Sequence, residues 1–299
     1  MYVVLGASGH TGHVVAEHLL AGRQKVRVVG RNAAHLQSLT SKGAEIFIAD
    51  VTDAGSLTKA FQEADAAFVM IPPNLASNDP LAYSNRVSDA IAAAVHTAGV
   101  KNIVALSSLG ADKSSGTGPV VGLHNLEEKL NQIIGANVLH LRAGSFMENT
   151  LPQVNAIRMM GSAAGALRAD LKLPMIATRD IGAVAAEALL HPTVHGKQTR
   201  ELLGQRDLAY TEVATIIGQA IGKPDLRYVQ VPDDQFRAVM VQMGMSEQFA
   251  RLMLEMTGAI NSGHMRALES RTTQNTTPTT YETFVPEYFV PAYKQQAAA

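Results

Sequence analysis

Short apolar runs alternate with longer amphipathic segments over the first 142 residues of the chain. Most of the short runs are apolar at every position, which is typical of strands buried on both faces of a parallel sheet. The longer segments have helical spacing, and Gly22, Gly99 and Gly135 stand where helix C-caps are expected. The predicted strands cover residues 2–5, 26–29, 45–49, 67–71, 103–106 and 138–141, and the predicted helices cover residues 11–21, 54–63, 82–98 and 121–134.

This alternation predicts an α/β fold, in which residues 1–142 form a doubly wound parallel Rossmann sheet. Residues 143–294 are expected to contribute to the sheet and to form a small, mostly helical C-terminal lobe beside it. Residues 295–299 are expected to be a frayed tail. In the second segment Asp180 and Thr211 are expected to precede helices ending near residues 190 and 221, two strands are expected at 199–203 and 228–231, and further helices are expected from Asp233 and Ser246.

Composition narrows the class of protein. The 299 residues are 46% hydrophobic and 17% charged, and 25 basic against 26 acidic residues give a formal charge of −1. A chain without a basic field is not expected to bind nucleic acid. No apolar run reaches the roughly 20 residues of a membrane span, and the absence of cysteine fits a reducing compartment. We expect a cytoplasmic protein, monomeric or homodimeric, with no membrane partner.

A glycine-rich loop between the first strand and the first helix carries the strongest chemical signal. Its residues are Gly6, Ala7, Ser8, Gly9, His10, Thr11 and Gly12. In this position Gly6 permits a sharp turn, Gly9 lets the backbone approach a pyrophosphate, and Gly12 lets helix and strand pack closely. The amides of the first helical turn then face the phosphates, so the loop predicts dinucleotide binding.

The end of the second strand is expected to contact the adenosine ribose, and Gly30 and Arg31 occupy that place. An arginine there favours a 2′-phosphate and hence NADP(H); if Arg31 is instead an ordinary solvated side chain, NAD(H) is used as well. Asp50 and Val51 follow the third strand and are placed to contact adenine, with a simple helix-capping role for Asp50 or Asp53 as the alternative.

These motifs, together with the segment Arg142-Ala-Gly-Ser-Phe-Met-Glu-Asn149, resemble the NmrA-like family of atypical short-chain dehydrogenases. The resemblance covers nearly the whole chain. It implies an NADP(H)-binding Rossmann domain whose cleft is closed by a small C-terminal lobe. Family members include NADPH-dependent quinone reductases, a triphenylmethane dye reductase and non-catalytic regulators that sense the dinucleotide.

Typical short-chain dehydrogenases carry Tyr-x-x-x-Lys, and the corresponding segment here runs from Asn125 to Lys129. The lysine is present and is expected to reach the cofactor, whereas asparagine has no titratable proton with which to replace tyrosine. His124 is the nearest titratable side chain, either as a catalytic group or as a surface histidine that contacts Glu128. An NAD(P)H-dependent oxidoreductase that lacks this tyrosine is best suited to a small conjugated acceptor, such as a quinone, whose product takes its proton from water.

Further residues are expected around the nicotinamide and the acceptor. Ile71 and Pro72 after the fourth strand and Ser107 at the end of the fifth are expected to border the cofactor. Phe146 and Asn149 are expected to line the acceptor pocket, with ordinary loop packing as the alternative. No metal site is expected, since His191 and His195 flank a proline in a predicted loop without nearby carboxylates.

Several alternatives remain open at this stage. Residues 111–119 form either a mobile lid or a solvent-exposed loop. Five methionines, Met240, Met243, Met245, Met253 and Met256, are either core filler or a soft apolar substrate wall. A non-catalytic NADP(H) sensor that binds a partner protein is the main alternative to the reductase. An isomerase or ether-bond reductase is a third, which requires a positioned base.

Overall fold

The computed structural model describes residues 1–295. Seven parallel strands form its central sheet in the order β10-β6-β5-β4-β1-β2-β3, which is a doubly wound Rossmann arrangement with one added edge strand. The predicted fold class is confirmed. The strands are β1 (Tyr2–Leu5), β2 (Val26–Gly30), β3 (Glu45–Ile48), β4 (Ala66–Val69), β5 (Asn102–Ser108), β6 (Asn137–Ala143) and β10 (Lys197–Leu202).

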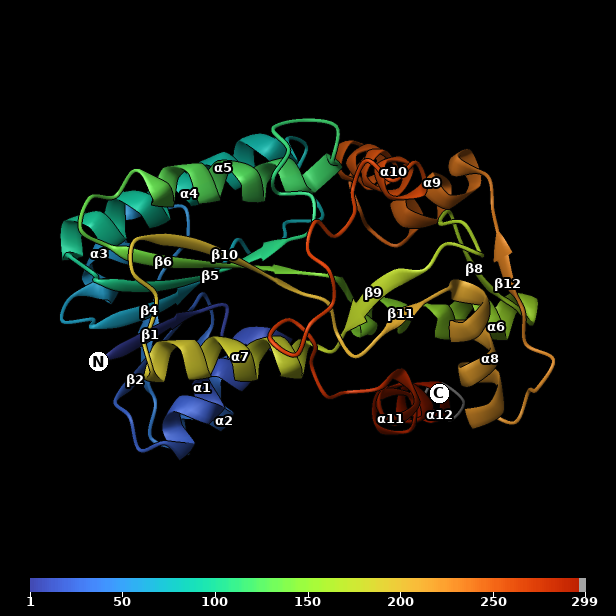
Figure 1. Ribbon diagram of the computed structural model, residues 1–299, viewed down its shortest axis with the longest axis horizontal. Coiled ribbons are helices and arrows are strands. Elements are labelled where there is room, and N and C mark those ends of the chain that lie inside the picture. Colours follow the sequence, from blue (N-terminus) through green and yellow to red (C-terminus); the bar gives the residue numbers. More distant parts are fainter. Residues whose placement is uncertain (296–299) are drawn as a thin grey trace.

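Helices cover both faces of this sheet (Figure 1). On one face lie α3 (Ala54–Phe61), α4 (Pro80–Ala98) and α5 (Val121–Asn131), and on the other lie α1 (His10–Ala21), the short α2 (Gln37–Thr40) and α7 (Thr178–Leu190). Each layer buries its own apolar cluster against the sheet. Because α7 and β10 come from the second half of the chain, the Rossmann body is completed only after residue 202.

A smaller lobe lies beyond the carboxyl ends of the central strands (Figure 1). Its core packs around Tyr281, Phe284 and Phe289, all of which are fully buried. Besides helices the lobe contains two small sheets whose strands are two to four residues long. The strand expected at residues 228–231 belongs to one of them, and the sequence did not predict their other strands. The lobe comprises β7 (Ser145–Phe146), α6 (Gln153–Met160), β8 (Ala163–Gly165), β9 (Leu173–Ile176), β11 (Asp207–Leu208), α8 (Tyr210–Ala220), β12 (Tyr228–Gln230), α9 (Asp233–Gln242), α10 (Glu247–Asn261), α11 (Tyr281–Phe284) and α12 (Val290–Gln295).

Several predicted boundaries were wrong by a few residues. The helix expected from residue 82 begins at Pro80, because the Asp79 side chain caps it with a 3.0 Å hydrogen bond from the Ala82 amide. The helices expected to end at residues 63 and 134 end at Phe61 and Asn131. Gln295, expected in a frayed tail, is the last residue of α12, and the rest of that tail lies outside the described residues.

Two predicted helix caps were also wrong. Helix α7 begins at Thr178, so Asp180 is its third residue, and the Asp180 carboxylate accepts hydrogen bonds from the amide and hydroxyl of Thr279. Helix α8 begins at Tyr210 rather than after Thr211, and the Glu212 carboxylate accepts a hydrogen bond from the amide of Ala209, the residue before the helix. Asp180 thus attaches the start of its helix to a distant segment, whereas Glu212 caps its own helix.

Candidate functional site

The glycine loop has the geometry of a phosphate cradle. Gly6 has a φ of +68°, and the Gly9 amide donates a 2.9 Å hydrogen bond to the Gly6 carbonyl, which closes the turn after β1. A Cβ on Gly12 would lie 2.4 Å from the Gly6 oxygen, so only glycine fits there. Gly9 precedes α1 without a side chain to cap it, and no acidic residue lies in the first helical turn. These amides are therefore free to bind an anionic diphosphate.

Arg31 and Asp50 stand at the ends of the neighbouring strands β2 and β3, and both are exposed. The Asp50 carboxylate accepts 2.8 Å hydrogen bonds from the amide and hydroxyl of Thr52. These bonds, aided by the charge of Arg31, hold the pKa of Asp50 below its usual range. Asp50 therefore caps a turn, whereas the helix cap offered for Asp50 or Asp53 belongs to Asp53, whose carboxylate accepts hydrogen bonds from the Gly55 and Ser56 amides at the start of α3. The adenine contact of Asp50 stays a prediction. Arg31 lies at the expected place for a 2′-phosphate contact, and that contact stays a prediction.

Tyr83 on α4 is a cleft residue that the sequence did not indicate. It is partly buried, and burial raises the pKa of its phenol, while the charge of Arg31 opposes this shift. The phenol therefore stays protonated at neutral pH and offers a hydrogen-bond donor. A tyrosine within a long amphipathic helix carries no local signal of such a position.

A cleft of about 410 Å³ opens at the carboxyl ends of β4, β5 and β6, between the sheet and the lobe. It brings together four residues expected near the nicotinamide and the acceptor: Ile71, Ser107, Phe146 and Asn149. Pro72 is not among its lining residues, and Pro73 takes that place. The opposite wall comes from α10 and the segment after it, and consists of Phe249, Met253, Met256, Ile260, Met265 and Arg266.

The C-terminal methionines include both residues that line the cleft and a residue that fills the core. Met253 and Met256 line the cleft as a flexible apolar wall. Met240 is buried, whereas the side chain of Met243 is exposed. The two ends of the 111–119 segment pack against α10, where Ala111 and the following Val120 join a small apolar cluster with Ala259 and Met265. Residues 114–116 between them are exposed, so the segment is attached to the lobe at its ends.

The segment equivalent to Tyr-x-x-x-Lys faces α4 and the loop after β5. His124 Nδ1 lies 2.9 Å from the Ala111 carbonyl oxygen, which is not the expected contact with Glu128. Asn125 donates a 2.8 Å hydrogen bond to the Asn85 side chain. The Lys129 ammonium lies 2.6 Å from an Asp89 carboxylate oxygen. None of the three lines the cleft, so their proposed catalytic and cofactor roles stay predictions.

A buried polar network supports the floor of the cleft beside these residues. The Ser107 hydroxyl donates a 2.5 Å hydrogen bond to Glu127, whose carboxylate is also bound by Arg142 through two bonds of 3.0 and 2.6 Å. Burial by itself would lower the pKa of Arg142, but the bonds and charge of Glu127 reverse this and raise it. The sequence did not single out Glu127, since an acid within Glu-Glu-Lys resembles a solvated helix face.

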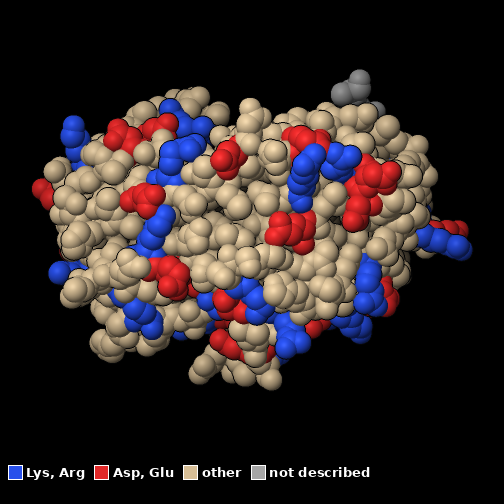
Figure 2. Space-filling view, turned by 90° about the horizontal axis from the view of Figure 1, so that it is seen from above, with Lys and Arg blue, Asp and Glu red and all other residues tan. Residues whose placement is uncertain are grey.

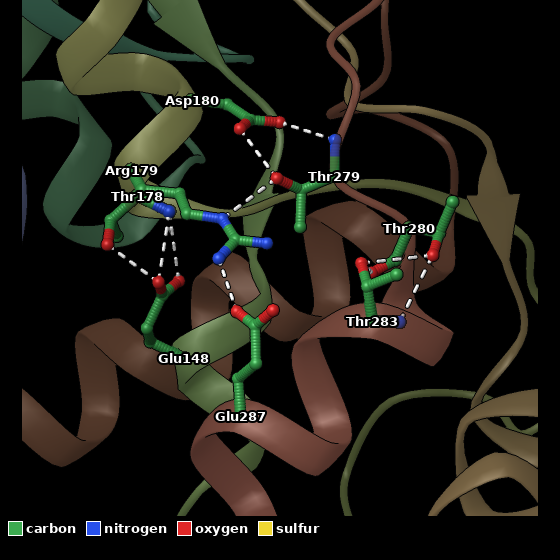
Figure 3. A network of polar contacts seen from close by, with 8 residues as sticks. All are labelled: Glu148, Thr178, Arg179, Asp180, Thr279, Thr280, Thr283 and Glu287. Atoms are coloured by element: carbon green, nitrogen blue, oxygen red, sulfur yellow. Dashed lines mark hydrogen bonds and ion pairs between the residues drawn. The ribbon is translucent and has the colours of Figure 1, made fainter.

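The junction between the sheet and the lobe is held by the start of α7 (Figure 3). Glu148 accepts hydrogen bonds from the amide and hydroxyl of Thr178, at 3.0 and 2.6 Å. Asp180 binds Thr279 at 2.9 and 2.6 Å, and Arg179 forms an ion pair with Glu287. Three consecutive residues of one helix, which packs on the sheet, thus attach three separate parts of the lobe.

Other ligand classes find little support in the described residues. Within residues 1–295 no group of three or more His, Asp or Glu side chains is arranged to hold a metal ion. Over the same residues no helix is both long and apolar enough to cross a membrane. On the face shown in Figure 2, basic and acidic side chains lie next to each other without a large area of one sign.

A Rossmann sheet with a glycine cradle at β1 and an apolar cleft under a C-terminal lobe defines a dinucleotide-binding protein of the α/β class. More specifically, the NmrA-like family model matches residues 2–288, and the chain belongs to that family. The resemblance inferred from the sequence is confirmed.

Individual relatives extend over most of the chain. The NAD(P)H azoreductase of Xenophilus azovorans is 31% identical over 258 residues, which is 86% of this chain and 86% of that protein. Quinone oxidoreductase 2 of Escherichia coli is 28% identical over 260 residues, which is 85% of this chain and 86% of that protein. A solved structure of an Escherichia coli NADPH-dependent quinone oxidoreductase complexed with NADPH matches with a TM-score of 0.80 and 25% identity, covering 97% of this chain and 100% of that one.

Proposed function

We propose that this chain is an NADPH-dependent reductase that transfers hydride to a quinone-like or other conjugated electrophilic acceptor. The observation that carries the proposal is the apolar cleft at the carboxyl ends of β4–β6, beside the cradle for a diphosphate. The names of the azoreductase and quinone oxidoreductase relatives support the same reaction class. Bound NADPH would supply the hydride.

The residues of the cleft mainly orient and desolvate the reactants. Phe146 and the methionine wall offer stacking and dispersion contacts to a flat ring system. The titratable side chains among the described lining residues are Tyr83 and Arg266, and neither acts as a base near neutral pH. Oxidation of an alcohol needs such a base, whereas a reduced quinone takes its proton from water or from the neutral Tyr83 phenol. The cleft therefore suits electrophilic acceptors.

The reaction is tested by following NADPH absorbance with a panel of quinones and azo dyes. Acceptor-dependent oxidation of NADPH is the expected result. Tight NADPH binding without turnover of any acceptor would contradict the reductase and favour the non-catalytic sensor. Lys129→Ala and His124→Ala should leave turnover measurable, and a complete loss of turnover with intact cofactor binding would favour chemistry that needs a positioned base.

Arg31→Ala is expected to weaken NADPH binding by about tenfold or more, because a charge-assisted bond to the 2′-phosphate contributes roughly 1.5–3 kcal/mol. The affinity for NADH, which lacks that phosphate, should fall by less than about twofold. Calorimetric titration of both nucleotides measures the difference. The control is Arg251→Ala on α10, an exposed arginine that is remote from the β2 end and pairs with Glu247. Equal losses for NADPH and NADH would remove the 2′-phosphate assignment.

A further inference from the structure

The cleft carries a single charge. Among the described residues that line it, Arg266 is the one ionic side chain, and no aspartate or glutamate is present. The rest of the lining is apolar or neutral, with Phe249, Met253, Met256 and Ile260 on the same wall as the arginine. An isolated guanidinium at the edge of an apolar cavity favours a ligand that is apolar over most of its surface and anionic at one end.

The backbone around Arg266 is held on both sides. The preceding residue, Met265, is buried against Gly110, and its amide donates a 3.0 Å hydrogen bond to the Ala259 carbonyl. Two residues further on, the amides of Leu268 and Glu269 donate bonds of 2.9–3.0 Å to the buried carboxylate of Glu201 on β10. Arg266 therefore lies on an anchored segment, which runs between the sheet and the lobe after α10 (Figure 1).

The Arg266 charge is available to a ligand. Its side chain is exposed, and no carboxylate among residues 1–295 forms an ion pair with it. This distinguishes it from Arg142 and Arg271, which are paired with Glu127 and Asp207. A planar guanidinium can bind both oxygens of a carboxylate or sulfonate and also stack on an aromatic ring.

We infer that Arg266 binds an anionic substituent, a carboxylate or sulfonate, on a flat aromatic acceptor whose rings lie against the methionine wall. This inference deepens the proposed function and rests on it, since the bound compound is a hydride acceptor only if the chain is a reductase. Binding of the anionic aromatic compound itself does not require turnover. The same charge disfavours cationic aromatic compounds, which would approach a guanidinium of like sign.

The binding test compares two fluorescent naphthalene probes of similar shape on the full chain without nucleotide. Anilinonaphthalene sulfonate carries the anion, and N-phenylnaphthylamine is its uncharged counterpart. Arg266→Gln is expected to weaken binding of the sulfonate probe by about fivefold, because a partly exposed ion pair contributes about 1 kcal/mol. The uncharged probe should change by less than about twofold, and Arg266→Lys should retain part of the preference.

Arg251→Gln serves as the matched control, because Arg251 is an exposed arginine of α10 that does not line the cleft. This substitution should change the binding affinity of neither probe. Equal weakening of both probes by Arg266→Gln would show that Arg266 only packs against the ligand, and no weakening of the sulfonate probe would show that the charge is not used. Either result overturns the inference, as would a loss of NADPH affinity comparable to the loss of the sulfonate probe.

A kinetic arm separates this inference from the proposed function. With wild-type protein, naphthoquinone sulfonate should have a lower KM than naphthoquinone, and Arg266→Gln should raise the KM for the sulfonate alone. If no quinone is turned over but the sulfonate probe still depends on Arg266, the reductase proposal fails and the anion site stands. If quinones are turned over with no preference for the sulfonate, the reductase stands and the anion site fails.

Discussion

Replacing Glu127 by alanine is expected to lower the free energy of unfolding by about 3–5 kcal/mol, the usual cost of removing one partner from a buried ion pair. The change would leave the Arg142 guanidinium, whose side chain is 14% exposed, without its two bonds to the carboxylate. It would also free the Ser107 hydroxyl at the floor of the cleft. Chemical denaturation of the apo protein, followed by circular dichroism, measures the loss.

Two further variants test this expected loss in the free energy of unfolding. Glu128→Ala removes the neighbouring acid, which is exposed, and should change the unfolding free energy by less than about 0.5 kcal/mol. Glu127→Gln keeps a hydrogen-bond acceptor but not the charge, and should fall between the wild type and Glu127→Ala. A loss for Glu127→Ala as small as that for Glu128→Ala would show that the network contributes little to stability.

The second large effect is expected at Gly12. A Gly12→Val side chain would meet the Gly6 carbonyl oxygen at 2.4 Å and the Leu5 oxygen at 2.9 Å, so α1 must move away from β1. Because the first-turn amides of α1 form the anion site, we expect NADPH affinity to fall by at least about a hundredfold, or about 2.7 kcal/mol. Titration of the folded variant with NADPH measures this change.

Gly22→Ala, at the other end of α1, is the matched control for this substitution. A Cβ at Gly22 would lie 3.4 Å from the Leu19 oxygen, which is close to an ordinary contact, and the Gly22 φ of −74° suits any residue. Its loss of NADPH affinity should therefore be much smaller than that of Gly12→Val. Folded Gly12→Val protein that binds NADPH as tightly as Gly22→Ala would contradict the assignment of the cradle.

The Rossmann half was predictable because its strands are buried on both faces and carry their signal locally. A run of only four apolar residues such as 103–106, with a predicted helix before and after it, indicates a buried strand. The glycine loop was predictable for the same reason, since a turn between a strand and a helix constrains residue type at fixed positions. The fold class and the family could therefore be inferred from the sequence.

The far wall of the cleft was less predictable, because tertiary contacts determine it. The spacing of Met253 and Met256 shows an amphipathic helix but not which surface that helix covers. Arg266 follows α10 in an irregular segment whose position depends on Glu201, more than sixty residues earlier in the chain. No local pattern indicates such a pairing.

The partners of two residues that the sequence singled out, one as catalytic and one as a helix cap, were hidden in the same way. Lys129 has the spacing of a dehydrogenase lysine, yet its ammonium contacts Asp89 on the neighbouring helix α4. Asp180 precedes an apolar helical run as a capping residue would, yet its carboxylate binds Thr279, 99 positions away. In both cases the sequence pattern indicated that the residue mattered, but it did not indicate the distant partner.

The way in which the C-terminal chain closes the lobe has a consequence for synthesis on the ribosome. The glycine cradle and Arg31 emerge before the lobe, and strands β1–β6 can pair before α10 is made. The wall of the cleft and the aromatic core around Tyr281 and Phe289 are made later than all of these. A nascent chain therefore holds the parts of its nucleotide cradle well before it can enclose an acceptor.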